Sequence, residues 1–126
     1  MADDDGVAKP RVLLVEDEPI IAMHLERVLE GAGWEVVGPA GQVDAALRLA
    51  WREPLDAALL DLDLHGRSGV PVGVALAARG VPVVVLSGSR GGQPPGPLAG
   101  VPRLDKPYRP EAVLRALAAA VLARAA

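Results

Sequence analysis

Two aspartates separated by one residue follow a short apolar segment in the middle of the chain. Residues 57–61 are mostly apolar and end in the carboxylate of Asp61, and Asp63 stands two residues further on, before a loop marked by glycines. An apolar run of this length, bounded by turn residues, predicts a buried strand of a parallel sheet. Because ligands of open α/β sheets collect at the carboxyl ends of the strands, we expect Asp61 to lie at the centre of a functional site.

Polar groups also follow three of the other apolar runs that predict strands: Glu16 with Asp17, Ser87, and Lys106. Converging carboxylates repel one another unless a cation is present, and oxygen-only ligands suit Mg²⁺. A carboxylate can attack phosphorus and form an aspartyl phosphate, while a metal and a lysine neutralise the phosphoryl group. The set therefore predicts a Mg²⁺-dependent phosphoacceptor site, in which the Ser87 hydroxyl can donate a hydrogen bond to a phosphoryl oxygen.

Strands and helices alternate along the chain. Apolar runs predict strands at residues 11–15, 34–38, 57–61, 81–86 and 103–104, and helical spacing of apolar residues predicts helices at 20–30, 43–51, 72–78 and from 110 onward. This alternation favours an α/β fold with a doubly wound parallel sheet. Right-handed crossovers then give five strands in the flavodoxin-like order 2-1-3-4-5. In this order, Glu16, Asp17 and Asp61 emerge from neighbouring strands, with Ser87 and Lys106 at the opposite wall.

Two segments depart from this regular alternation. Residues 90–102 contain four prolines and four glycines, too many breakers for a stable helix, so we expect the fourth helix to be short or absent and this loop to be mobile. Residues 1–9 are expected to form a flexible lead-in, within a chain of 126 residues that folds as one domain.

Composition narrows the function further. A net charge of −3 and a pI near 5.3 argue against binding to nucleic acid. The absence of cysteine excludes disulfides and thiolate chemistry. The acidic N-terminus is unlike a signal peptide, and the apolar stretch at residues 116–123 is too short to span a bilayer, so we expect a cytoplasmic protein without membrane contact.

The sequence resembles the receiver domains of two-component response regulators over roughly residues 9–124. The matching motifs are VEDE at 15–18, LLDLDLHGRSG at 59–69, VVLSG at 84–88 and DKP at 105–107. The resemblance implies a receiver-like domain that takes a phosphoryl group from a histidine kinase or a phosphotransfer protein and signals through protein–protein contacts. It implies no enzymatic turnover beyond slow autodephosphorylation. The glycine after Ser87 and the proline-rich stretch resemble an α-proteobacterial single-domain subgroup with an atypical fourth helix.

By this resemblance each candidate residue has an expected role. Asp61 is the phosphoacceptor, and Mg²⁺ is held by Glu16, Asp17, Asp61 and the backbone carbonyl of Asp63. Ser87 is the switch hydroxyl and Lys106 the paired lysine, and the resemblance implies a cis bond between Lys106 and Pro107. Gly69 also stands where the family has glycine.

Two positions depart from the family pattern. His65 replaces a frequent proline, and Arg103 replaces the aromatic residue that changes position on activation. The chain has no phenylalanine, and its only tyrosine, Tyr108, lies beyond the lysine, so it does not supply that aromatic residue. We therefore expect standard phosphoacceptor chemistry with a non-standard signalling switch.

Alternative interpretations stay open at this level. A haloacid-dehalogenase-like phosphatase also uses a D-x-D strand end with a serine and a lysine, although two predicted strands precede Asp61 here. A receiver-shaped binding module that no longer accepts phosphate is the other alternative. The sequence does not distinguish a stand-alone regulator from a fragment of a longer chain, and it identifies neither the cognate kinase nor the target protein.

The remaining residues with chemical potential have more ordinary explanations. His24 is expected to be a helix residue that flanks the apolar face or is half-buried, and neither it nor His65 is expected to be catalytic. Trp34 and Trp51 are expected to pack in or near the core. The final helix is apolar around much of its circumference, which indicates either a contact surface, for example of a homodimer, or only the high helix propensity of alanine.

Overall fold

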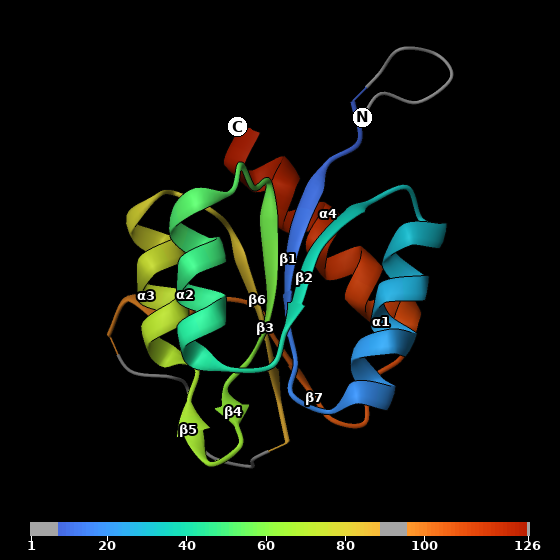
Figure 1. Ribbon diagram of the computed structural model, residues 1–126. Helices are drawn as coiled ribbons and strands as arrows, with labels where there is room; N and C mark the ends of the chain where they lie inside the picture. Colours follow the sequence, from blue (N-terminus) through green and yellow to red (C-terminus); the bar gives the residue numbers. More distant parts are fainter. Residues whose placement is uncertain (1–7, 89–95, 126) are drawn as a thin grey trace.

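A five-stranded parallel sheet forms the centre of the protein (Figure 1). The computed structural model describes residues 8–88 and 96–125. The sheet has the order β2-β1-β3-β6-β7, with every neighbouring pair parallel: β1 (Arg11–Val15), β2 (Glu35–Ala40), β3 (Ala57–Asp61), β6 (Val83–Ser87) and β7 (Arg103–Asp105). The predicted flavodoxin-like order 2-1-3-4-5 is confirmed.

Helices cover both faces of this sheet. On one face lie α1 (Pro19–Gly31) and α4 (Pro110–Ala125), and on the other lie α2 (Val43–Arg52) and α3 (Val70–Ala78). Alternate residues of β1 divide between the two layers, since Val12 packs on the α1 side and Leu13 on the α2 side. All five residues of β3 are buried, as expected for a strand covered on both faces.

The second strand extends further than the sequence pattern predicts. It was expected at residues 34–38, but it runs to Ala40 through Gly38 and a cis bond to Pro39. A Cβ on Gly38 (φ 96°) would lie 2.8 Å from the Ala40 nitrogen and 2.9 Å from the Leu14 oxygen, so only glycine fits this irregular pairing. Glycine and proline usually end a strand, and here the pairing with β1 continues past both of them.

No α-helix separates β6 from β7 within the described residues. Residues Gly96–Leu98 form a short 3-10 helix, η1, whose Leu98 is fully buried and which packs beside α3. The prediction that the fourth helix is short or absent is confirmed for residues 96–102. The predicted mobility of residues 90–95 and of the lead-in at 1–7 falls outside the described residues.

The two tryptophans have opposite environments. Trp34 is buried, at 8% exposure, whereas Trp51 is 58% exposed, so the expectation that Trp51 packs near the core is wrong. The buried face of α2 is formed by Val43, Ala46 and Ala50, and the residue after Ala50 is turned about 100° away from it. His24 is exposed and flanks the buried Leu25, which agrees with the first of the two environments expected for it.

A small antiparallel hairpin follows β3 and was not anticipated. It pairs β4 (Asp63–Leu64) with β5 (Arg67–Ser68) and lies beside the carboxyl ends of the main strands. Within the described ranges, no helix is long and apolar enough to cross a membrane.

Candidate functional site

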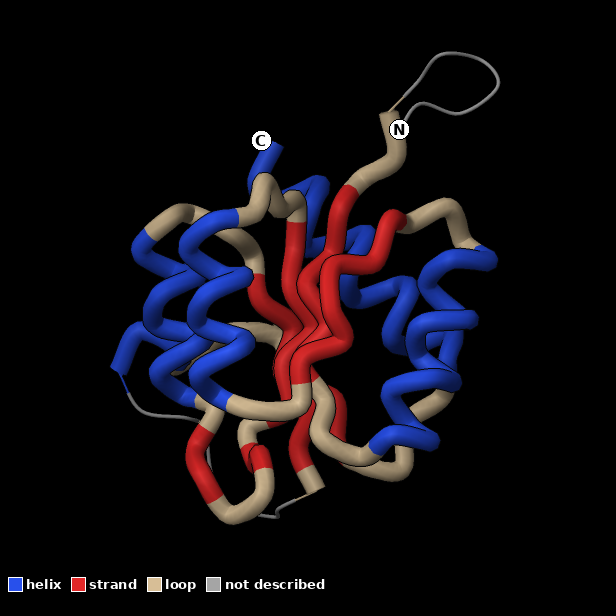
Figure 2. Tube along the Cα trace, viewed as in Figure 1, coloured by secondary structure: helices blue, strands red, loops and turns tan. Residues whose placement is uncertain are grey.

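The predicted site residues meet at the carboxyl edge of the sheet, which lies at the bottom of the view in Figure 2. Asp61 and Ser87 are the last residues of β3 and β6, Glu16 follows β1, and Lys106 follows β7. Asp61, Glu16 and Ser87 are all buried, although each carries a polar side chain. Parallel strand polarity alone brings these four elements to one edge.

Lys106 forms ion pairs with both buried carboxylates, Asp61 and Glu16. Its Nζ lies 2.9 Å from Asp61 Oδ2 and 3.5 Å from Glu16 Oε1. Burial opposes the charged ammonium, but the hydrogen bond and the charge of Asp61 outweigh it, so the pKa of Lys106 is raised. The lysine is therefore a cation in direct contact with the buried Asp61 carboxylate.

Glu16 is a buried carboxylate with one of its two oxygens left without a hydrogen bond among the described residues. Its Oε2 accepts a hydrogen bond from the Glu18 backbone N–H at 3.1 Å, whereas Oε1 is buried and has no hydrogen-bond partner in the part of the chain that the structure describes. Burial, together with the charge of Asp61, raises the pKa of Glu16 to about 7. A buried carboxylate oxygen without a partner is costly, and a bound cation would satisfy it.

Asp17 is contacted by the hairpin formed by β4 and β5. Its Oδ2 accepts a hydrogen bond from the His65 backbone N–H at 2.8 Å, and the His65 Nδ1 lies 3.5 Å from the same oxygen. Partial burial acts to raise the pKa of Asp17, but the His65 N–H and neighbouring groups outweigh it, so the pKa is lowered. Asp17 is therefore an anion ready to bind a cation.

The carboxylates fit a small divalent cation. Ligand oxygens of Glu16, Asp17 and Glu18 lie within 4.8 Å of one another. The Asp63 backbone N–H donates to Asp61 Oδ1 at 2.9 Å, which orients the Asp61 carboxylate beside this group. An all-oxygen donor set with an unsatisfied buried oxygen suits Mg²⁺. Glu18 belongs to the cluster but was given no metal role from the sequence, although its place in the run of three acids was a signal.

Gly69 lets the loop after β3 pass close to Asp61. A Cβ at this position would lie 2.5 Å from the Asp61 carbonyl oxygen, a distance that real Cβ atoms do not show. The Gly69 N–H also donates to the Leu62 oxygen at 2.9 Å. The glycine eight residues after Asp61 is thus required by backbone contact.

The opposite wall is formed by the ends of β6 and β7. The Lys106 backbone N–H donates to the Ser87 oxygen at 2.8 Å, which fixes the lysine next to the serine. The bond between Lys106 and Pro107 is cis, as the resemblance implied. Arg103, which stands where an aromatic residue was expected, lies on β7 and its Nε donates to Asp105 Oδ1 at 2.9 Å.

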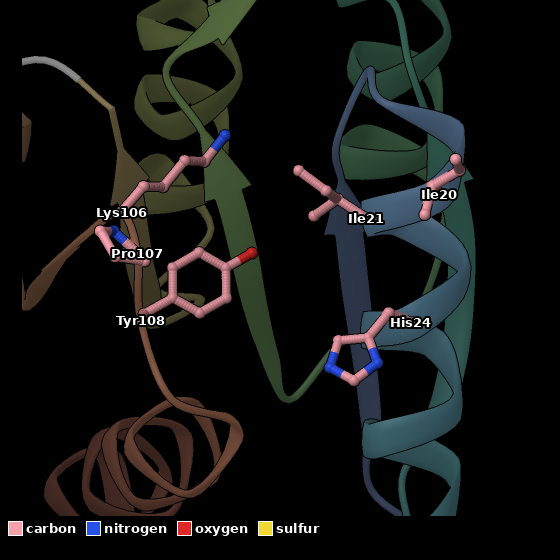
Figure 3. A pocket seen from close by; sticks show the side chains of 6 residues that line it. All are labelled: Ile20, Ile21, His24, Lys106, Pro107 and Tyr108. Atoms are coloured by element: carbon pink, nitrogen blue, oxygen red, sulfur yellow. The ribbon is translucent and has the colours of Figure 1, made fainter.

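An apolar groove lies next to the site, between the first turn of α1 and the loop after β7 (Figure 3). It has a volume of about 560 Å³ and is lined by Ile20, Ile21, His24, Lys106, Pro107 and Tyr108. The Tyr108 hydroxyl points toward α1 (Figure 3), and burial together with the charge of Glu16 raises the pKa of Tyr108 to about 12. No sequence motif singled out Ile20 or Tyr108 as functional residues.

The fold and the site define a receiver of the two-component type. The chain matches the response regulator receiver domain family over residues 12–94, more than half of its length, and belongs to that family. It is similar to the transcriptional regulatory protein PdtaR of Mycobacterium tuberculosis, with 35% identity over 86 residues that cover 68% of this chain and 42% of PdtaR. The chain therefore spans about two fifths of the length of that relative.

Solved structures agree with this assignment. SdrG from Sphingomonas melonis Fr1 is 39% identical and superposes with a TM-score of 0.77, covering 90% of this chain and 97% of SdrG. The receiver domain of the sensor histidine kinase PA1611 from Pseudomonas aeruginosa PAO1 is 29% identical, with a TM-score of 0.78 over 90% of this chain and 98% of that domain. The PA1611 crystal structure has a magnesium ion coordinated in its active site cleft.

Proposed function

We propose that this chain is a phosphoacceptor of a two-component phosphorelay and that Asp61 is the residue phosphorylated. The contact between Lys106 Nζ and Asp61 Oδ2, at 2.9 Å, is the observation that carries the proposal, because it sets a cation against a buried carboxylate at the strand edge. A purely structural ion pair does not require the second buried carboxylate beside it, Glu16, whose Oε1 lies 3.5 Å from the same Lys106 Nζ and has no hydrogen-bond partner among the described residues.

The transfer is a substitution at phosphorus. An Asp61 carboxylate oxygen attacks the phosphorus of a phosphohistidine, a P–O bond forms, the P–N bond breaks, and the donor imidazole leaves and takes up a proton. Lys106 keeps its positive charge opposite the phosphoryl oxygens, and the Ser87 hydroxyl donates a hydrogen bond to one of them. The product is an acyl phosphate that water hydrolyses slowly, so the protein is an acceptor and not a turnover enzyme.

Mg²⁺ is the cofactor that the carboxylates would hold. Glu16, Asp17, Asp61 and the backbone carbonyl of Asp63 would bind it. When bound, the ion supplies positive charge that neutralises the phosphoryl oxygens. The magnesium ion in the cleft of the PA1611 receiver supports this assignment by similarity.

The proposed partners are proteins. The donor is a histidine kinase or a phosphotransfer protein, and the signal passes to a target protein through contacts that change on phosphorylation, in the cytoplasm and without nucleic acid or membrane. The net charge of −3 supports the absence of nucleic-acid binding. A homodimer through the apolar surface of α4 is one form such contacts can take.

Intact-mass spectrometry tests the proposal directly. Wild type, Asp61→Ala and Asp105→Asn are incubated with acetyl phosphate, with Mg²⁺ or with EDTA. We expect one phosphoryl adduct on wild type and on Asp105→Asn only with Mg²⁺, and none on Asp61→Ala. Asp105 is the matched control because it is an exposed aspartate next to Lys106. An adduct on Asp61→Ala, or one formed equally in EDTA, would contradict the proposal.

The two alternatives make different predictions in the same assay. A receiver-shaped module that no longer accepts phosphate would show no adduct on any variant. A titration of that module with beryllofluoride would also produce no change. The haloacid-dehalogenase-like phosphatase is not retained, because the chain matches the receiver family and because β1 and β2 precede the strand that ends in Asp61.

A further inference from the structure

The hairpin after β3 makes a direct contact with the acidic loop after β1. The His65 backbone N–H donates to Asp17 Oδ2 at 2.8 Å, a hydrogen bond between residues 48 positions apart. The His65 imidazole approaches the same oxygen only at 3.5 Å, and its side chain is 66% exposed, whereas that of Asp17 is 13% exposed. The backbone amide is therefore the closer of the two contacts.

The shape of the hairpin makes this amide available. His65 (φ 53°) and Gly66 (φ 79°) form the two-residue turn between the paired residues Leu64 and Arg67. Two consecutive positive φ angles are typical of a type I′ turn, which leaves the first turn residue outside the strand ladder. The Gly66 N–H donates to Asp63 Oδ1 at 3.2 Å and holds the turn. The amide of His65 is thus directed at Asp17 by backbone conformation.

A hydrogen bond to one oxygen restricts the orientation of the whole carboxylate. Hydrogen bonds from neighbouring groups orient metal-binding carboxylates, and their loss typically weakens metal binding about 10–100-fold. The cluster formed by Asp17, Glu16 and Glu18 contains a buried Glu16 oxygen without a hydrogen-bond partner among the described residues, which points to a cation there. A proline at position 65 has no N–H and is restricted to φ near −65°.

We propose that His65 is a positioning residue for the cation site: its backbone amide orients Asp17, so that Mg²⁺ affinity depends on the conformation of the turn between β4 and β5. The proposal rests on the proposed function, because it requires Asp17 to be a Mg²⁺ ligand. It assigns to position 65 a role that the frequent proline of the family pattern cannot perform.

Isothermal titration calorimetry with MgCl₂ distinguishes the contribution of the His65 backbone amide to Mg²⁺ affinity from that of its imidazole. His65→Gly keeps the N–H and adopts positive φ easily, His65→Val keeps the N–H but resists positive φ, and His65→Pro has neither the donor nor the conformation. We expect Kd for Mg²⁺ to stay within about threefold of wild type in the Gly variant and to rise about 10–100-fold in the Pro variant, with Val between them. Equal affinity in the Pro variant and wild type overturns the proposal, and so does equal weakening in the Gly and Pro variants, which would assign the effect to the imidazole.

Separate control measurements test the effect of each variant on folding and on phosphorylation. Circular dichroism and urea unfolding report whether each variant folds, and if the Pro variant does not, the comparison of Val with Gly decides. A positioning role also predicts that the Val variant needs more Mg²⁺ for half-maximal phosphorylation by acetyl phosphate but reaches the wild-type rate at saturating Mg²⁺. Wild type that binds no Mg²⁺ would overturn the metal part of the proposed function as well, whereas normal wild-type binding with no difference among the variants would overturn this inference alone.

Discussion

Glu16 Oε1 lies 3.5 Å from Lys106 Nζ, but the lysine makes its hydrogen bond to Asp61, at 2.9 Å. One cation therefore serves two buried carboxylates and satisfies only one of them. Glu16 is therefore a buried carboxylate with an oxygen that the described residues satisfy incompletely, which lowers the stability of the fold.

Removing the Glu16 charge should stabilise the metal-free protein above neutral pH. Because burial raises the pKa of Glu16 to about 7 from 4.5, the folded protein binds this proton more tightly than the unfolded chain. The stability that the proton contributes is present below pH 4.5 and is lost as pH rises to about 7. In EDTA at pH 8, Glu16→Gln should exceed wild type by on the order of 2 kcal/mol in urea unfolding, and the difference should be small at pH 4.5.

The same variant should bind Mg²⁺ more weakly, because an amide oxygen carries less charge than a carboxylate. Glu26→Gln, a partly buried glutamate on α1, is the matched control and should change neither property by much. A Glu16→Gln protein less stable than wild type at pH 8 in EDTA would show that Glu16 has a favourable partner in solution.

Adding one methyl group at Gly69 should damage the site. The new Cβ would lie 2.5 Å from the Asp61 carbonyl oxygen, so the backbone must shift beside Asp61, the proposed phosphoacceptor. We expect Gly69→Ala to lose about 1–3 kcal/mol of stability and most of its phosphorylation by acetyl phosphate. Gly31→Ala is the control, because a Cβ at this residue, the last of α1, meets nothing within 4 Å. Equal phosphorylation of both variants would mean that the loop after β3 can relax without moving Asp61.

Tyr108 should lose its proton at a higher pH than a free tyrosine, and the free energy of unfolding should decrease at high pH as a result. Burial raises its pKa to about 12 from 10.0, so the folded protein keeps the phenol proton where the unfolded chain has lost it. The stability from this group is present below pH 10.0 and is lost as pH rises to about 12. Because Tyr108 is the only tyrosine, the phenolate absorbance reports this residue alone. Tyr108→Phe should lack that part of the decrease in stability, and a phenol that titrates at pH 10 would show that the groove is open to water.

Most of the helices and strands could be predicted from local sequence patterns. The apolar runs at β1 and β3 have the predicted bounds, and the start of α2 and the end of α3 agree with the predicted helices. Errors occurred where tertiary contacts override local signals. Strand β2 continues through Gly38 and Pro39 because the neighbouring β1 pairs with it beyond these residues.

The sequence by itself determined the order of elements and the residue types at the strand ends, because hydrophobic periodicity and the D-x-D, SG and DKP motifs are local. From these, strand polarity and right-handed crossovers were enough to predict which side chains meet. Only the tertiary structure decided three features: the exposure of Trp51, the Glu16 oxygen that lacks a hydrogen-bond partner among the described residues, and the contact of His65 with Asp17. These features depend on how loops that are distant in the sequence approach one another and on which atoms they exclude from water, and no local pattern carries that information.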